Sequence, residues 1–230
     1  MNIAVIPARG GSKRIPRKNI RDFCGLPIIA RSIRTALATG LFASVIVSTD
    51  DEAIAETARA HGAETPFMRP ASLADDFTGT TPVIRHALQW CLADGREVET
   101  VCGLYATAPF CLPADLERGH AALAGAPAAF AVTTFAYPIQ RGLRRDADGR
   151  MTLFWPEHRA TRSQDLPEAF HDCGQFYWAT REFLLAGKEF MDGEAVGVPI
   201  PRHRVQDIDT EEDWVRAEAM YRVLGETGEL

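Results

Sequence analysis

The hydrophobic positions of this chain alternate between short apolar runs and longer stretches with helical spacing. The apolar runs have the length of buried strands and lie at Ile3–Ile6, Ser44–Ser48, Glu99–Tyr105 and Ala128–Thr134. Helical segments follow at Pro27–Gly40, from Thr49 or Asp50 to His61, and at Val83–Leu92 and Pro113–Leu123. This alternation predicts a doubly wound α/β fold with a mostly parallel sheet flanked by helices.

The pattern changes in the second half of the chain. It loosens from Phe135 to Asp165, where short strands are expected near Gly142–Arg145 and Met151–Phe154 around a turn at 146–149. Phe170–Trp178 is rich in aromatic residues, which favours core packing. Thr210 is expected to cap a last helix, whose apolar positions recur at helical spacing. We interpret residues 1–230 as one domain, with 135–165 as an insertion within it.

The loop after the first predicted strand is strongly basic. Pro7 ends the strand, and Gly10 and Gly11 give the backbone a wide choice of conformations. Six cationic residues follow with no acidic residue among them: Arg9, Lys13, Arg14, Arg17, Lys18 and Arg21. Backbone N–H groups, glycines and cations at the carboxyl end of a strand suit a polyphosphate. The alternative is a solvated basic loop. The patterns G-x-x-x-x-G-K-[ST] and G-x-G-x-x-G are both absent from this loop.

Composition narrows the classes of function. The net charge of −6 argues against general nucleic-acid binding. Five cysteines without a C-x-x-C pair favour reduced thiols, and therefore a cytoplasmic protein, and neither they nor the histidines show zinc-ligand spacing. No signal peptide is apparent. The uncharged stretch Gly119–Gln140 is interrupted by Gly125, Pro127 and Pro138, so we do not expect it to span a membrane.

The basic loop P-A-R-G-G-S-K-R-I-P-R-K-N resembles the signature loop of the CMP–sialic acid synthetase family, roughly A-R-x-x-S-K-x-x-P-x-K-N. The matching positions are Ala8, Arg9, Ser12, Lys13, Pro16, Lys18 and Asn19. The resemblance implies that Lys18 contacts the α-phosphate of CTP and that Asn19 contacts the nucleoside. It also places Ala8, Arg9, Gly10, Ser12 and Lys13 along the nucleotide, with Arg9 and Lys18 in catalytic roles.

Two later segments also resemble the family. The stretch R-P-A-S-L-A-D-D, from Arg69, is similar to an R-P-x-x-L-A-x-D segment that contacts the base. The resemblance therefore implies that Arg69 binds cytosine, with Thr80 or Thr81 as a weaker candidate. Taken without it, Arg69 is an arginine in a loop. V-I-V-S-T-D-D-E, from Val45, resembles a second family motif, but a strand end followed by a helix cap explains it.

The resemblance also implies residues for the sugar. Tyr105 begins the segment Y-A-T-A-P. Most sialate enzymes of the family have a segment similar to Q-P-T-S-P at this place, and this difference points to the pseudaminic acid branch. Gly174 and Tyr177 match a G-x-x-Y element, so that Gln175 and Tyr177 would hold the acyl groups, the alternative being core packing. Arg162 lies at the position where members of the family have an arginine that reaches from one subunit of a dimer to the sugar carboxylate bound in the other. The alternative is a surface arginine beside Asp165.

The acidic stretch V-Q-D-I-D-T-E-E-D-W lies near the end of the chain. If Val205–Ile208 is extended, Asp207 and Asp209 project on the same side and can bind Mg²⁺. D-x-D alone is a weak signal, but in the resembled family it is the metal motif. Glu211, Glu212 and Asp213 are instead expected in the first turn of the last helix, where negative charge is favourable.

Together with these features, the family resemblance implies a cytidylyltransferase. It would transfer CMP from CTP to the anomeric hydroxyl of a nine-carbon α-keto sugar acid, with one or two Mg²⁺ ions, and release pyrophosphate. In-line attack on the α-phosphorus needs no protein nucleophile, and Asp209 would assist catalysis through the metal. Pseudaminic acid is the expected substrate, with N-acetylneuraminate and legionaminate as alternatives, and a homodimer is expected. A nucleotide-binding regulatory protein and a uridylyl- or guanylyltransferase are the alternative functions.

Overall fold

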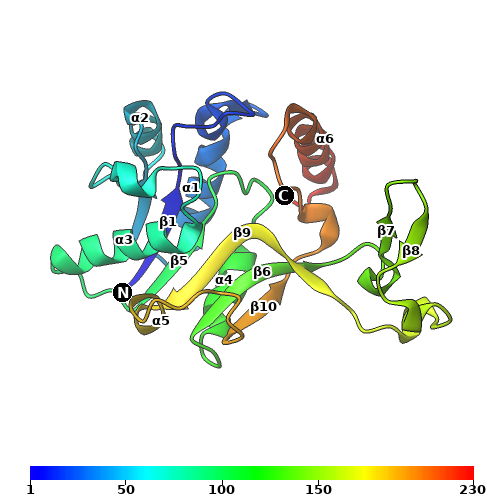
Figure 1. The fold of residues 1–230 in the computed structure, drawn as a ribbon. Helices are drawn as coiled ribbons and strands as arrows, with labels where there is room; N and C mark the ends of the chain where they lie inside the picture. The colour runs from blue at the N-terminus through cyan, green and yellow to red at the C-terminus, as the bar shows by residue number, and fades with distance from the viewer.

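A six-stranded sheet organises the computed structural model, which describes residues 1–230. Its strands are β1 (Asn2–Pro7), β4 (Ser44–Ser48), β5 (Thr100–Leu104), β6 (Ala128–Thr134), β9 (Phe170–Thr180) and β10 (Ala195–Pro199), in the order β10-β6-β9-β5-β1-β4. The pairs β1–β4, β1–β5 and β10–β6 are parallel, and β9 is antiparallel to both of its neighbours. The sheet is therefore mostly parallel, as predicted (Figure 1).

Helices cover both faces of this sheet. They are α1 (Ile28–Ala38), α2 (Glu52–Ala60), α3 (Thr80–Ala93), α4 (Pro113–Ala122) and α5 (Arg181–Leu185), and a sixth helix, α6 (Glu211–Thr227), lies apart from the sheet. Side chains alternate along β1, so that Ala4 and Ile6 pack in one core with α1, α2 and α4, and Ile3 and Val5 pack in a second core with α3 and α5. The doubly wound prediction is confirmed. None of the helices combines the length and apolar character needed to cross a membrane.

The last helix forms a third, smaller core at the edge of the molecule. Thr210 caps α6 as predicted, because its hydroxyl accepts from the N–H of Asp213 at 3.2 Å and the Asp213 carboxylate accepts from the N–H of Thr210 at 2.9 Å. Trp214 then packs edge-on against Phe23 of the two-residue strand β2 (Asp22–Phe23), which pairs with β3 (Leu26–Pro27). This packing holds α6 beside the basic loop.

Several element boundaries differ from the prediction. The cap of α2 is Asp51, not Thr49 or Asp50, because its carboxylate accepts from the N–H groups of Ala53 and Ile54. Helix α3 begins three residues before Val83. The prediction omitted α5, which is too short for a periodic pattern, and the edge strand β10. Gly197 of β10 lies so close to β6 that a Cβ would be 2.8 Å from Val132.

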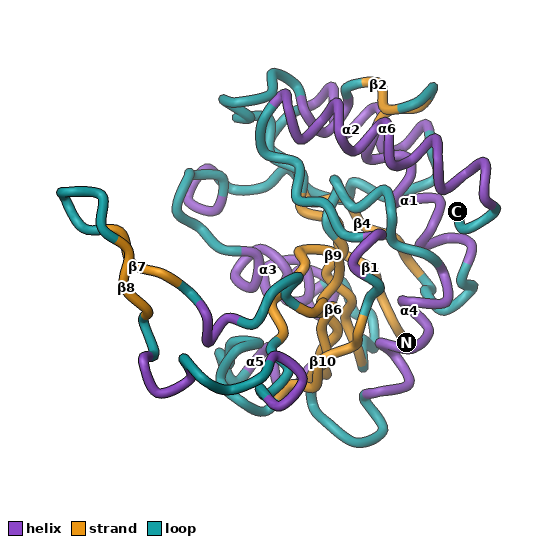
Figure 2. The backbone as a smooth tube through the Cα atoms, turned by 90° about the vertical axis from the view of Figure 1, so that its right-hand side faces the viewer, coloured by secondary structure: helices purple, strands orange, loops and turns teal.

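The insertion forms an arm that extends away from the sheet (Figures 1 and 2). Its two short strands, β7 (Leu143–Arg145) and β8 (Met151–Leu153), pair antiparallel where the sequence predicted them. Exposed large apolar side chains gather on the arm and at its base, at Phe135, Tyr137, Ile139, Leu143, Met151, Phe154, Trp155 and Phe170. The arm is therefore an apolar surface attached to a compact α/β body.

Candidate active site

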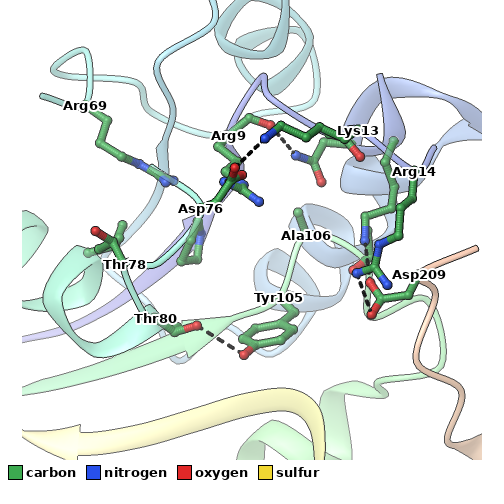
Figure 3. Close-up of a pocket in the computed structure, with 17 residues that line it drawn as sticks. Arg9, Lys13, Arg14, Arg69, Asp76, Thr78, Thr80, Tyr105, Ala106 and Asp209 are labelled. Atoms are coloured by element: carbon green, nitrogen blue, oxygen red, sulfur yellow. Dashed lines mark hydrogen bonds and ion pairs between the residues drawn. The ribbon is translucent and has the colours of Figure 1, made fainter. Parts of the chain in front are cut away.

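A cavity of about 560 Å³ lies at the carboxyl ends of β1 and β5 (Figure 3). The basic loop contributes Arg9, Ser12, Lys13, Arg14, Lys18 and Asn19 to its wall. The other lining residues come from the segment before and at the start of α3, from the loop after β5, and from Asp209. Ligands of open α/β sheets bind at this end of the strands.

The geometry of the basic loop depends on one glycine and one asparagine. Gly10 donates its N–H to Asp50 Oδ1 at 2.9 Å, and a Cβ there would lie 2.8 Å from Asp51 Oδ2, so only glycine fits. Asn19 is nearly buried and donates its side-chain amide to the carbonyl of Arg9 at 2.9 Å. Ala8 is fully buried. Ala8 and Gly10 thus shape the loop, and do not line the cavity.

Five cations and two carboxylates line the cavity, which leaves an excess of positive charge. The cations are Arg9, Lys13, Arg14, Lys18 and Arg69. Asp76 pairs with Arg9 at 2.7 Å and with Lys13 at 2.5 Å. Asp209 pairs with Arg14 at 2.9 Å and with Lys18 at 3.4 Å. The two carboxylates hold four cations around a space suited to a polyphosphate.

Arg69 is fixed in the wall of the cavity. Its guanidinium is buried and contacts the carbonyl and hydroxyl of Ser48, at the end of β4. Burial lowers the pKa of Arg69 to about 10. Thr80 also lines the cavity, whereas the hydroxyl of Thr81 donates to Glu189 at 2.6 Å on the other side of the helix start. Of the two residues that the resemblance offered as weaker candidates, Thr80 lines the cavity and Thr81 does not.

A second cavity of about 490 Å³ adjoins the first at Tyr105, which lines both. Its wall is formed by the start of β9 and the segment before α6, at Tyr105, His171, Asp172, Cys173, Gly174, Tyr177, Val205, Gln206 and Asp207. A smaller hollow of about 290 Å³, with Phe190 and Met191 in its wall, also contacts Tyr105 and Tyr177. The structure thus brings two of the predicted sugar residues, Tyr105 and Tyr177, together at the junction of the cavities.

The other two predicted sugar residues lie outside these cavities. Gln175 is buried, and its amide donates to the carbonyl of Arg204 at 2.7 Å, so it anchors the segment that leads to Asp207. Arg162 lies on the arm and pairs with Asp165 at 2.7 Å. Within one chain Arg162 makes the contact of a surface arginine, and its role toward a partner subunit stays a prediction.

The acidic pair bridges the two cavities. Asp209 lines the first and Asp207 the second. Burial, and then the neighbouring charge of Asp209, raises the pKa of Asp207 above its usual value. No group of three or more His, Cys, Asp or Glu side chains is placed to enclose a metal ion. Mg²⁺ in phosphate-transferring sites is commonly held by one or two carboxylates together with substrate phosphates, and Asp207 and Asp209 fit that arrangement.

Sequence reasoning missed two site residues, Asp76 and Asp172. Asp76 lies in the L-A-D-D segment quoted above, so the sequence analysis included this residue but assigned it no function. Asp172 accepts from the hydroxyl of Tyr177 at 2.6 Å. Its neighbours in the chain, His171 and Cys173, gave no indication of this contact.

The mostly parallel sheet, the cation-lined cavity at its carboxyl edge and the adjoining acidic pair are typical of nucleotidyltransferases. The family model for cytidylyltransferases matches residues 3–142. The chain belongs to the cytidylyltransferase family, and the resemblance inferred from the basic loop is confirmed.

Relatives of known function are similar over nearly their whole length. A pseudaminic acid cytidylyltransferase of Campylobacter jejuni is 40% identical, over 98% of this chain and 98% of that protein. A CMP-N,N'-diacetyllegionaminic acid synthase of Legionella pneumophila is 30% identical, over 95% of each. The solved structure of a CMP:2-keto-3-deoxy-manno-octonic acid synthetase complexed with CTP superimposes with a TM-score of 0.70, at 20% identity, over 100% of this chain and 99% of that one.

Proposed function

We propose that this enzyme transfers CMP from CTP to the anomeric hydroxyl of pseudaminic acid and releases pyrophosphate. The observation that carries the proposal is the pair of cavities that meet at Tyr105. The cation-lined cavity suits the triphosphate, and the adjoining one offers hydroxyl and carboxylate groups that suit a sugar. Similarity to the Campylobacter jejuni enzyme over almost the full chain supports pseudaminic acid over the alternatives.

The basic loop would position CTP and stabilise the charge that develops on its phosphates. Lys18 is the cation that the loop resemblance assigns to the α-phosphate, and it lies next to Asp209. Arg9, Ser12 and Lys13 would hold the rest of the phosphate chain. Arg69, immobilised by Ser48, would read the cytosine base. In-line displacement requires this alignment and no protein nucleophile.

Mg²⁺ is the proposed cofactor, with Asp207 and Asp209 as the residues that would hold one or two ions. When bound, the ion neutralises phosphate charge and favours deprotonation of the attacking hydroxyl. Asp209 is now paired with Arg14 and Lys18. We expect those two cations to turn toward the phosphates when CTP binds, which frees the Asp209 carboxylate for coordination.

We also propose a homodimer formed through the arm. None of the residues that line the second cavity is Lys or Arg, yet the sugar acid carries a carboxylate. Arg162 of the partner subunit would supply the cation. The exposed apolar side chains of the arm support burial against a second copy. The use of CTP and the five free thiols favour a cytoplasmic enzyme.

The test is pyrophosphate release from CTP in the presence of Mg²⁺ with purified sugar acids. We expect turnover with pseudaminic acid to exceed turnover with N-acetylneuraminate and with legionaminate. A preference for either of those would overturn the substrate assignment and leave the reaction class intact. If CTP binds tightly but pyrophosphate is released with none of the three sugar acids, the regulatory alternative is favoured.

A further inference from the structure

Asp172 is a carboxylate at the junction of the sugar-side cavities that has no cation of its own. It lines both the second cavity and the smaller hollow beside it. One oxygen accepts from the N–H of Gly174 at 2.9 Å, and the other accepts from the hydroxyl of Tyr177 at 2.6 Å. No Lys or Arg lies within ion-pair distance of it. Two ionised oxygens can accept about four hydrogen bonds, so capacity remains toward the cavity.

A row of hydroxyl groups connects Asp172 to the nucleotide side. Thr80 donates to the Tyr105 hydroxyl at 3.1 Å, and the Tyr105 and Tyr177 hydroxyls lie 3.4 Å apart. Burial, the neighbouring Tyr105 and the charge of Asp172 hold the pKa of Tyr177 well above its usual value, so Tyr177 keeps its proton. Because an ionised carboxylate can only accept, that proton points at Asp172. The row therefore ends on an acceptor, which is held in a fixed orientation.

The charge of Asp172 restricts which part of a sugar acid it can meet. The carboxylate of the substrate would be repelled, whereas an N–H or O–H group would be bound. Pseudaminic acid carries two acylamino groups, and N-acetylneuraminate carries one together with a more hydroxylated tail. The proposed substrate thus offers more amide N–H donors away from its own charge.

We propose that Asp172 is a specificity-determining residue, which accepts a hydrogen bond from an acylamino N–H of the sugar acid and so favours a diacylamino sugar acid over N-acetylneuraminate. This inference rests on the proposed function. Tyr177 and Gly174 act as its supports, since they fix both carboxylate oxygens. If Asp172 served only to shape the turn at Gly174, its replacement would alter stability without altering the choice of sugar.

The first test is Asp172→Asn, assayed by pyrophosphate release at saturating CTP. Loss of a hydrogen bond to a charged acceptor predicts a rise in KM for pseudaminic acid of about 10- to 100-fold, with kcat changed only a few-fold. The Kd for CTP, from calorimetry, should stay at the wild-type value. Glu117→Gln removes one charge from an exposed site on α4 and is the matched control. An unchanged KM for pseudaminic acid in the folded variant would overturn the inference.

A second measurement uses the unaltered enzyme, in case Asp172→Asn does not fold. A pseudaminic acid analogue in which oxygen replaces an acylamino nitrogen keeps the acyl group and removes the donor. Among the analogues altered at either nitrogen, the wild-type enzyme should lose about 10- to 100-fold in kcat/KM for one. If kcat/KM is the same for pseudaminic acid and for both analogues, the inference is overturned. Pyrophosphate release with pseudaminic acid would still uphold the proposed function in that case. Absence of release with pseudaminic acid itself would overturn both.

Discussion

The ion pair between Asp115 and Arg204 is buried, so the loss of either partner alone should be strongly destabilising, and this effect is accessible to direct measurement. Both side chains are nearly buried, at 2% and 7% exposure. The two guanidinium nitrogens of Arg204 reach the two carboxylate oxygens of Asp115 at 2.5 and 3.0 Å, and Arg204 also donates to the carbonyl of Phe110. The pair thereby ties the segment before Asp207 to the N-terminal end of α4.

Removing one partner of a buried pair leaves the other charge without compensation, which costs about 3 to 5 kcal/mol. Asparagine keeps one acceptor oxygen, so we expect Asp115→Asn to lower the free energy of unfolding by about 3 kcal/mol. Arg204→Met should cost a similar amount. Since domains are typically stable by only about 5 to 15 kcal/mol, the loss should be evident at room temperature.

Urea unfolding followed by tryptophan fluorescence measures this effect, with Trp178 and Trp214 as buried reporters. Arg118→Ala is the control: Arg118 contacts the same carboxylate at 2.8 Å, but its side chain is 52% exposed. Its loss should cost less than about 1 kcal/mol. If Asp115→Asn and Arg204→Met both stay within about 1 kcal/mol of wild type, the assignment of the pair as a stabilising anchor is refuted.

Three further predictions concern the site and its surroundings. Lys18→Ala should lower kcat by about 100-fold or more, whereas Lys188→Ala, which removes a surface pair with Glu194, should leave turnover unchanged; equal turnover in both variants would exclude Lys18 from the mechanism. Asp76→Asn should tighten CTP binding about tenfold by calorimetry, because the carboxylate competes with phosphates for the two cations it pairs; weaker binding would show instead that Asp76 contacts the nucleotide. Burial raises the pKa of Cys173 to about 12, so above pH about 8.5 the unfolded thiol ionises while the folded thiol does not. The free energy of unfolding should therefore fall as pH rises from 8.5 toward 12, and less steeply in Cys173→Ala; identical slopes would contradict this.

The basic loop was predictable because its chemistry is local. A strand, glycines and six cations lie within one short stretch, and the structure gathers four of those cations around one cavity. Asp76 could not be assigned in this way, since it is 63 residues from Lys13 in the sequence and meets it only through the fold. The counter-charges of the site are long-range, and no pattern of spacing reveals them.

Side-chain direction was the second limit. Thr80 and Thr81 are adjacent at the start of α3, and a helix turns by about 100° between neighbours. The structure therefore directs Thr80 to the cavity and Thr81 to Glu189. Gln175 was assigned to the sugar from its place beside Tyr177, but β9 is irregular there, with Gly174 at a φ of +61°. A sequence pattern gives the element, and small backbone changes decide which neighbour reaches the ligand.

The arm leaves and rejoins the sheet at a single rung of the β6–β9 ladder. Thr134 and Phe170 are register partners, and the N–H of Phe135 donates to the carbonyl of Ala169 at 3.1 Å. The two ends of this excursion are therefore one strand spacing apart, about 5 Å. Shortening, lengthening or exchanging the arm would leave the register of every core strand unchanged. The length and shape of the arm can thus diverge here independently of the nucleotide pocket, and the same junction offers a graft point for a foreign domain.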